Sequence, residues 1–244
     1  MNPEKVVVGL GVAATALVAW APTVLNVGPM VGAPMLPLDT VAVALFVTAW
    51  TVSMVAMMFP TAVPMVMMFL HVGRTSSPEI RQGGGPSPGK AAVFVVTYLG
   101  IWVATGILLY LVEAAVLGRL PVSASLFIGT PLGVGIALLV VALYQLSPLK
   151  GECLARCHPT SFLFKYYRGG LSGSARMGLS YAKYCVGCCW VMMIFLLVSA
   201  TMALAWMALF TVVIFAERNL PLRSWAPKFF GVGFAILGAA LIVI

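Results

Sequence analysis

Charged side chains are scarce in this sequence of 244 residues, because aspartate, glutamate, lysine and arginine together make up only 8% of it. An ordinary soluble domain carries about 25%. Apolar residues make up 62% of the chain, and its mean hydropathy is +1.08. This balance excludes an ordinary soluble domain. It predicts an all-α fold, a polytopic bundle of transmembrane helices, since helices satisfy their own backbone hydrogen bonds in lipid.

Histidine is almost absent too, with two residues in the whole chain. There is no paired-histidine motif of a haem or di-iron membrane oxidase, and most copper or iron oxygenase centres therefore cannot be built from this chain alone. The sequence also lacks a P-loop, a GxSxG nucleophile and an HExxH zinc motif. These absences favour a role other than that of an enzyme.

A bilayer span takes about 20 mostly apolar residues. We expect seven spans, with six as the alternative if 185–216 forms one long tilted helix instead of a hairpin. The first segment also has the Ala-Trp-Ala pattern of a cleavable signal peptide, which is the alternative to a first span. The expected spans are 6–22, 40–59, 91–117, 131–147, 185–200, 202–216 and 229–244.

The basic residues predict the orientation of these spans. When seven spans are traced from a cytoplasmic N-terminus, every lysine and arginine except Arg119 falls on the inner side. Such asymmetry is typical of the cytoplasmic side of membrane proteins. We expect the inner or plasma membrane of a prokaryote. The net charge of +8 then indicates membrane lipids with anionic headgroups as partners, and not nucleic acid.

The organisation predicted from composition is one integral membrane domain over 1–244. Residues 73–90 (GRTSSPEIRQGGGPSPGK) are expected to form a flexible cytoplasmic loop. Residues 148–184 are expected to form a second cytoplasmic loop that carries cysteines. Within it, aromatic and basic residues are mixed, which predicts a short interfacial helix near 160–168.

Five cysteines fall into two groups on the predicted cytoplasmic side. The first is a C-x3-C pair followed directly by a histidine, and the second lies in YCVGCCW, where cysteines three and four residues apart share a helix face. Thiolates suit soft metals such as Cu(I), with zinc as the alternative, and cytosolic thiols stay reduced. The candidate metal ligands are Cys153, Cys157, His158, Cys185, Cys188, Cys189 and Met192, with Met193 beside it.

Methionine is the second soft ligand in this chain. Six of the 14 methionines lie within residues 54–68, on a segment that also carries Pro60 and Pro64. Prolines bend a helix, and in lipid a broken helix needs protein or a cavity to satisfy its freed carbonyls. A methionine-lined path favours copper over zinc. Ordinary packing by an adaptable side chain is the other interpretation.

Three further ionisable residues lie at or near the ends of the expected spans. His71 ends the second span and is either an added ligand or a solvated interfacial residue. Glu113 and Glu217 lie at span ends. Intramembrane acids are candidates for function, but Glu217 precedes Arg218 directly, which predicts a local charge pair.

Several motifs occur in an order that resembles a known family. They are MMFPTAVPM (57–65), YQLSPLKGECLARC (144–157), GSARMG (173–178), YCVGCCW (184–190) and MALAWM (202–207). Together they resemble the predicted metal-binding integral membrane protein family, domain of unknown function 2182, from about residue 45 to 225. The resemblance implies metal binding. Tyr181 and Ala182 stand where members of that family carry a His-Gly pair.

These observations lead to one main hypothesis and three rivals. The main hypothesis is a membrane protein that handles Cu(I), in storage, delivery or assembly of a membrane copper enzyme whose subunits are its partners. The rivals are a non-catalytic accessory subunit of a larger membrane complex, a membrane thiol–disulfide oxidoreductase that uses Cys185 with Cys188, and a transporter built on the proline-broken helix.

Overall fold

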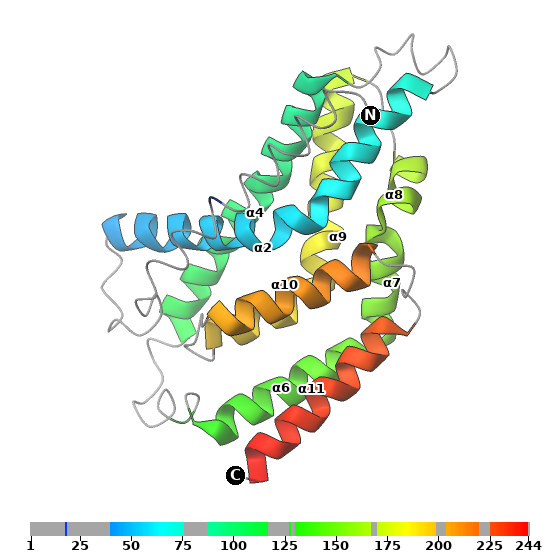
Figure 1. Cartoon of the computed structure of the whole chain (residues 1–244). Coiled ribbons are helices and arrows are strands. Elements are labelled where there is room, and N and C mark those ends of the chain that lie inside the picture. The colour runs from blue at the N-terminus through cyan, green and yellow to red at the C-terminus, as the bar shows by residue number, and fades with distance from the viewer. Residues whose placement is uncertain are drawn as a thin grey trace.

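The structure is a computed structural model that describes residues 18, 40–75, 87–116, 127, 130–166, 170–198, 204–219 and 225–243. Every regular element in this part of the chain is an α-helix, which confirms the all-α class (Figure 1). The helices are α2 (Thr40–Thr75), α4 (Pro88–Val116), α6 (Pro131–Leu146), α7 (Pro148–Cys157), α8 (Pro159–Tyr166), α9 (Gly170–Val198), α10 (Leu204–Asn219) and α11 (Ala226–Val243).

Four described helices are long and apolar enough to cross a membrane, over Val43–Leu70, Pro88–Val112, Gly170–Leu197 and Ala226–Val243. Helices α6 and α7 pass the same test together as a fifth, although they are bent by 64° at their junction. The expected span 6–22 lies outside the described residues, apart from the single helical residue at 18. A total of seven spans therefore stays a prediction.

Two helices occupy the segment 185–216, as the hairpin interpretation requires. Helix α9 ends at Val198 and α10 begins at Leu204. The start of α9 differs from the expectation, because it begins at Gly170, 15 residues before Cys185. Hydropathy predicts only the most apolar part of this helix. The more polar residues 170–184 continue the same helix, and one face of them, with Ser174, Met177 and Tyr181, is buried against the protein.

The segment 148–184 is correspondingly helical over most of its length. It contains α7, α8 and the first half of α9. Ser147 caps α7 by accepting from the Lys150 amide, and Pro148 occupies the first turn, where its missing N–H costs nothing. The expected short helix near 160–168 is present as α8, and its position at a membrane interface stays a prediction. Of the expected loop 73–90, residues 76–86 lie outside the described residues.

Helix α2 runs through both of its prolines and changes direction along its length (Figure 1). Polar side chains gather at the prolines. Thr61 Oγ1 donates to the Met58 carbonyl at 2.8 Å, and Asn219 Nδ2 donates to the Thr61 carbonyl at 3.5 Å. The end of α10 thus contacts α2 through a hydrogen bond between its two prolines.

Helices α6 and α11 form a close pair along the molecule (Figure 1). Their backbones meet at Gly135 and Gly238. A Cβ built on either glycine would lie 2.8 Å from the carbonyl oxygen of the other. Only glycine permits this approach, which is typical of helices that pack through small residues.

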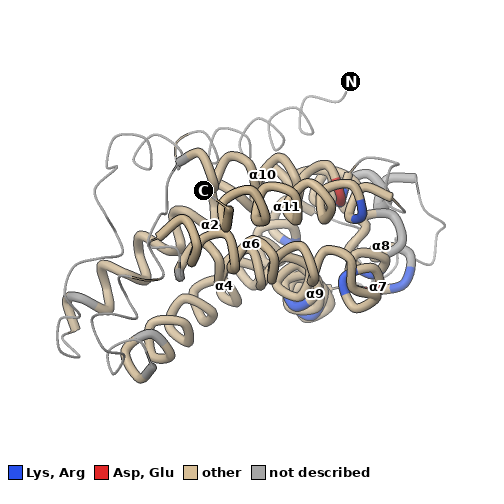
Figure 2. The backbone as a smooth tube through the Cα atoms, turned by 90° about the horizontal axis from the view of Figure 1, so that it is seen from below, with Lys and Arg blue, Asp and Glu red and all other residues tan. Residues whose placement is uncertain are grey.

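The described lysines and arginines gather toward one end of the bundle, beside α7, α8 and the start of α9 (Figure 2). This is the end that the charge asymmetry of the sequence assigns to the cytoplasm. The thiol-bearing helix α7 and the first half of α9 lie at the same end.

Candidate metal-binding site

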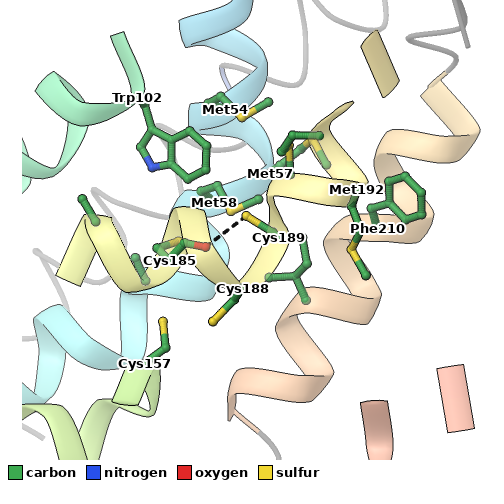
Figure 3. Close-up of a cluster of buried hydrophobic side chains, with 14 of the residues drawn as sticks. Met54, Met57, Met58, Trp102, Cys157, Cys185, Cys188, Cys189, Met192 and Phe210 are labelled. Atoms are coloured by element: carbon green, nitrogen blue, oxygen red, sulfur yellow. Dashed lines mark hydrogen bonds between the residues drawn. The ribbon is translucent and has the colours of Figure 1, made fainter. Parts of the chain in front are cut away.

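The two groups of cysteines meet between α7 and α9. Cys157, the last residue of α7, is fully buried, and its side chain points toward the turn of α9 that carries the buried Cys185 and Cys188 (Figure 3). Cys153, one turn earlier on α7, packs against Gly187. A Cβ at Gly187 would lie 3.2 Å from the Cys153 sulfur. Residues about 30 apart in the chain thus share one interface.

The thiols of this interface are reduced and enclosed. All five cysteines are free, and Cys157, Cys185, Cys188 and Cys189 are each at most 3% exposed. Cys153 is half-buried. Within the described residues, no group of three or more Cys, His, Asp or Glu side chains is arranged to hold a metal ion. The full ligand set expected from the sequence therefore stays a prediction.

Cys185 is the thiol with the most polar neighbours. Arg218 Nη1 donates to its sulfur at 3.0 Å, and the Tyr98 hydroxyl lies 3.2 Å from the same atom. Cys189 Sγ donates to the Cys185 backbone carbonyl at 3.1 Å, as the dashed line in Figure 3 marks. The sulfur of Cys185 thus faces donors, whereas that of Cys189 is itself occupied as a donor.

Arg218 enters this site from the last turn of α10 and is 1% exposed. Its Nη1 also donates to Thr61 Oγ1 at 2.9 Å, and its guanidinium carbon lies 5.0 Å from the centre of the Tyr181 ring. Its Nε and Nη2 have no hydrogen-bond partner within the part of the chain that the structure describes. A cation with unused donors therefore lies against the thiols.

Glu217 does not form the local pair with Arg218 that the sequence suggested. Its carboxylate turns the other way and lies 2.7 Å from Lys150 Nζ, with both side chains buried. Gln145 Nε2 donates to Glu217 at 2.6 Å, and Lys150 donates to the Gln145 amide oxygen. Neighbours in a helix point about 100° apart, so Glu217 and Arg218 reach different partners.

The methionines of α2 face the thiols from the opposite side. Met54, Met57 and Met58 are buried and lie beside the turn of α9 that carries Cys185 and Cys189 (Figure 3). Met192 continues along α9 toward Phe210 of α10 and is also buried. The centre of the bundle is therefore rich in both thiols and thioethers.

The two histidines contribute less to the described site. His158 follows Cys157 at the end of α7, is half-buried, and its carbonyl accepts from the Phe162 amide at 2.9 Å. Its role as a ligand stays a prediction. The His71 side chain lies outside the described residues.

Sequence reasoning missed Arg218 and Tyr98 as parts of the site. Arg218 ends the apolar run of α10, and an ionisable residue beside such a run signals function by default. The position of Arg218 beside this apolar run could have identified it as a candidate, but the sequence suggested an ion pair with the adjacent Glu217 instead. Tyr98 lies in α4, 87 residues before Cys185, and carries no local pattern that points to the thiols.

A helical bundle with thiols and thioethers enclosed at its centre offers the ligands that soft metal ions prefer. A family described as PpoB2, copper chaperone, matches residues 47–241, which include nearly all of the described helices. The chain belongs to this copper chaperone family. The family found is thus a copper-related one, and not the one named from the sequence motifs. No curated protein and no solved structure matches the chain significantly.

Proposed function

We propose that the protein is an integral membrane copper carrier that binds Cu(I) as its cargo at the α7–α9 interface and passes it to a membrane copper enzyme. The observation that carries this proposal is that three buried cysteines from two helices face one another across the α7–α9 interface, Cys157 on α7 and Cys185 and Cys188 on α9 (Figure 3).

The chemistry of the donors favours Cu(I) over zinc. Thiolate and thioether are soft ligands, and Cu(I) accepts few of them. Structural zinc sites are usually closed by four ligands in a tetrahedron. Because no three Cys, His, Asp or Glu side chains converge within the described residues, the geometry suits the ion with the smaller ligand requirement.

The methionines of α2 suit a carrier better than a permanent store. Thioethers bind soft metals weakly enough to exchange, and Met57 and Met58 lie next to the thiols (Figure 3). Copper that leaves the thiols would thus meet further sulfur ligands along α2. Delivery by ligand exchange is the role that this arrangement favours. The basic residues at the same end of the bundle support a cytoplasmic position of the thiols.

The test is the metal content of the protein, purified in detergent under reducing conditions, measured by mass spectrometry. We expect about one copper per chain, absent from the Cys185→Ser/Cys188→Ser/Cys189→Ser variant. Met177→Leu is the matched control, because it removes a buried sulfur from the same helix about two turns earlier. Wild-type protein that is folded and takes up no copper, even when Cu(I) is supplied, would contradict the proposal.

The rivals make different predictions in the same experiment. An accessory subunit with packing cysteines would hold no copper and would co-purify with stoichiometric partners. Thiol–disulfide exchange needs an accessible thiolate, and the burial of Cys185 and Cys188 counts against it.

A further inference from the structure

Arg218 carries a buried positive charge that no carboxylate balances within the described residues. The nearest acid in the chain, Glu217, is already paired with Lys150 at 2.7 Å. Arg218 instead faces the sulfur of Cys185, the hydroxyl of Thr61 and the ring of Tyr181. An unpaired charge in an apolar interior is costly, so a partner of opposite sign is expected when the site is in use.

The unused donors of Arg218 point to the same conclusion. Nη1 already makes two hydrogen bonds, whereas Nε and Nη2 make none within the described chain, and the buried Tyr181 hydroxyl has no partner there either. The guanidinium that carries two of these donors contacts the sulfur of Cys185, and the Tyr181 ring lies against it. Buried donors without acceptors are rare in folded proteins. An anion formed at the thiols would supply the missing acceptors.

We propose that Arg218 determines the metal selectivity of this site, by balancing the single negative charge of a Cu(I) ion held by the thiolates of Cys157 and Cys185. This inference rests on the proposed function. On binding, the two thiols each release one proton to solvent, two copper–sulfur bonds form, and copper stays in the +1 state. The complex has a charge of −1, and Arg218 brings the site to zero.

The same charge balance disfavours a divalent ion. Zn²⁺ with the same two thiolates is neutral, so the site with Arg218 would keep a buried charge of +1. A third thiolate would restore balance for zinc, but no three Cys, His, Asp or Glu side chains are arranged as ligands within the described residues. Arg218 therefore acts on selectivity through charge, and not as a ligand.

The test compares variants of the full chain in detergent, exposed under reducing conditions to equal amounts of Cu(I) and Zn²⁺, with both metals then counted. We expect Arg218→Gln to lower the ratio of bound copper to zinc at least about tenfold. Arg218→Lys keeps the charge but loses the planar fork, and should retain most of the ratio. Lys183→Gln is the control, because it removes a charge from the exposed side of α9 near Cys185.

Each outcome decides one question. An unchanged ratio in folded Arg218→Gln, or an equal fall in Lys183→Gln, overturns the role of Arg218 while leaving copper binding intact. If wild-type protein binds no copper at all, the proposed function fails first. If Arg218→Gln does not fold, X-ray absorption of the copper-loaded wild-type protein still tests the proposal, because it counts the sulfur ligands of the copper ion. Two sulfur ligands support the charge balance, whereas three or four overturn it.

Discussion

Lys150 Nζ and Glu217 Oε2 lie 2.7 Å apart in a buried ion pair that joins the start of α7 to the end of α10. This pair and the Arg218–Cys185 contact use adjacent residues of one helix turn. The turn thus anchors the thiol-bearing helix α7 on one side and reaches the thiols of α9 on the other.

Removal of one member of this ion pair should destabilise the protein strongly. Lys150→Met leaves the Glu217 carboxylate buried without its cation, which costs about 3–5 kcal/mol. The double variant Lys150→Met/Glu217→Gln removes both charges and should recover most of that loss. Thermal unfolding in detergent measures both, and equal destabilisation of the single and double variants would count against an ion pair.

The cysteines should differ in their importance for copper. Cys157→Ser should lose bound copper, because it removes the only thiol that α7 brings fully into the core. Cys189→Ser should keep most of it, since the serine hydroxyl can make the hydrogen bond that the Cys189 thiol now donates to the Cys185 carbonyl. The measurement is the copper bound per chain in each variant. A similar loss of copper in both variants would mean that Cys189 is a ligand as well.

The close approach of α6 and α11 should tolerate no side chain. Gly135→Ala places a methyl group 2.8 Å from the Gly238 carbonyl oxygen, and we expect a loss of about 1–3 kcal/mol in unfolding free energy. Gly233→Ala is the matched control on α11, because nothing lies within 4 Å of its Cβ position. That variant should be neutral or slightly stabilised by the helix preference of alanine. If the free energy of unfolding fell equally in both variants, the cause would be something other than the contact between Gly135 and Gly238.

The orientation of the bundle predicts which side of the membrane each helix end faces. Ser172→Cys, on the exposed start of α9, should react with a membrane-impermeant thiol reagent only in inside-out vesicles. Thr130→Cys, at the start of α6, should react only in right-side-out vesicles. The native thiols are mostly buried and give a low background. The reversed pattern would place the starts of α6 and α9 on the opposite sides of the membrane from those expected.

Local features of the site could be predicted from the sequence. The spacing of Cys185, Cys188 and Cys189 fixes their shared face as soon as the segment is helical, and α9 is helical there. The change of direction of α2 was predictable from Pro60 and Pro64, which bend a helix (Figure 1). Both predictions depend only on residues within a few positions of one another.

Contacts between residues far apart in the chain could not be predicted from the sequence. Cys157 ends a helix that is bent by 64° from the helix before it, and hydropathy does not predict such a bend. The partners of Arg218 lie 33 and 157 residues away in the chain. The start of α9 was placed too late because its first residues pack on protein, so they need not be apolar enough for lipid.

The enclosure of the thiols has a kinetic consequence. In the proposed function, a metal ion would reach Cys157, Cys185 and Cys188 only after the packed helices around them open, since these residues are almost fully buried. The rates of loading and release are then governed by the opening of two packed helices, and not by the bonding of copper to sulfur. A tightly held ion can leave quickly if a partner protein holds the helices apart, and a weakly held one can stay trapped.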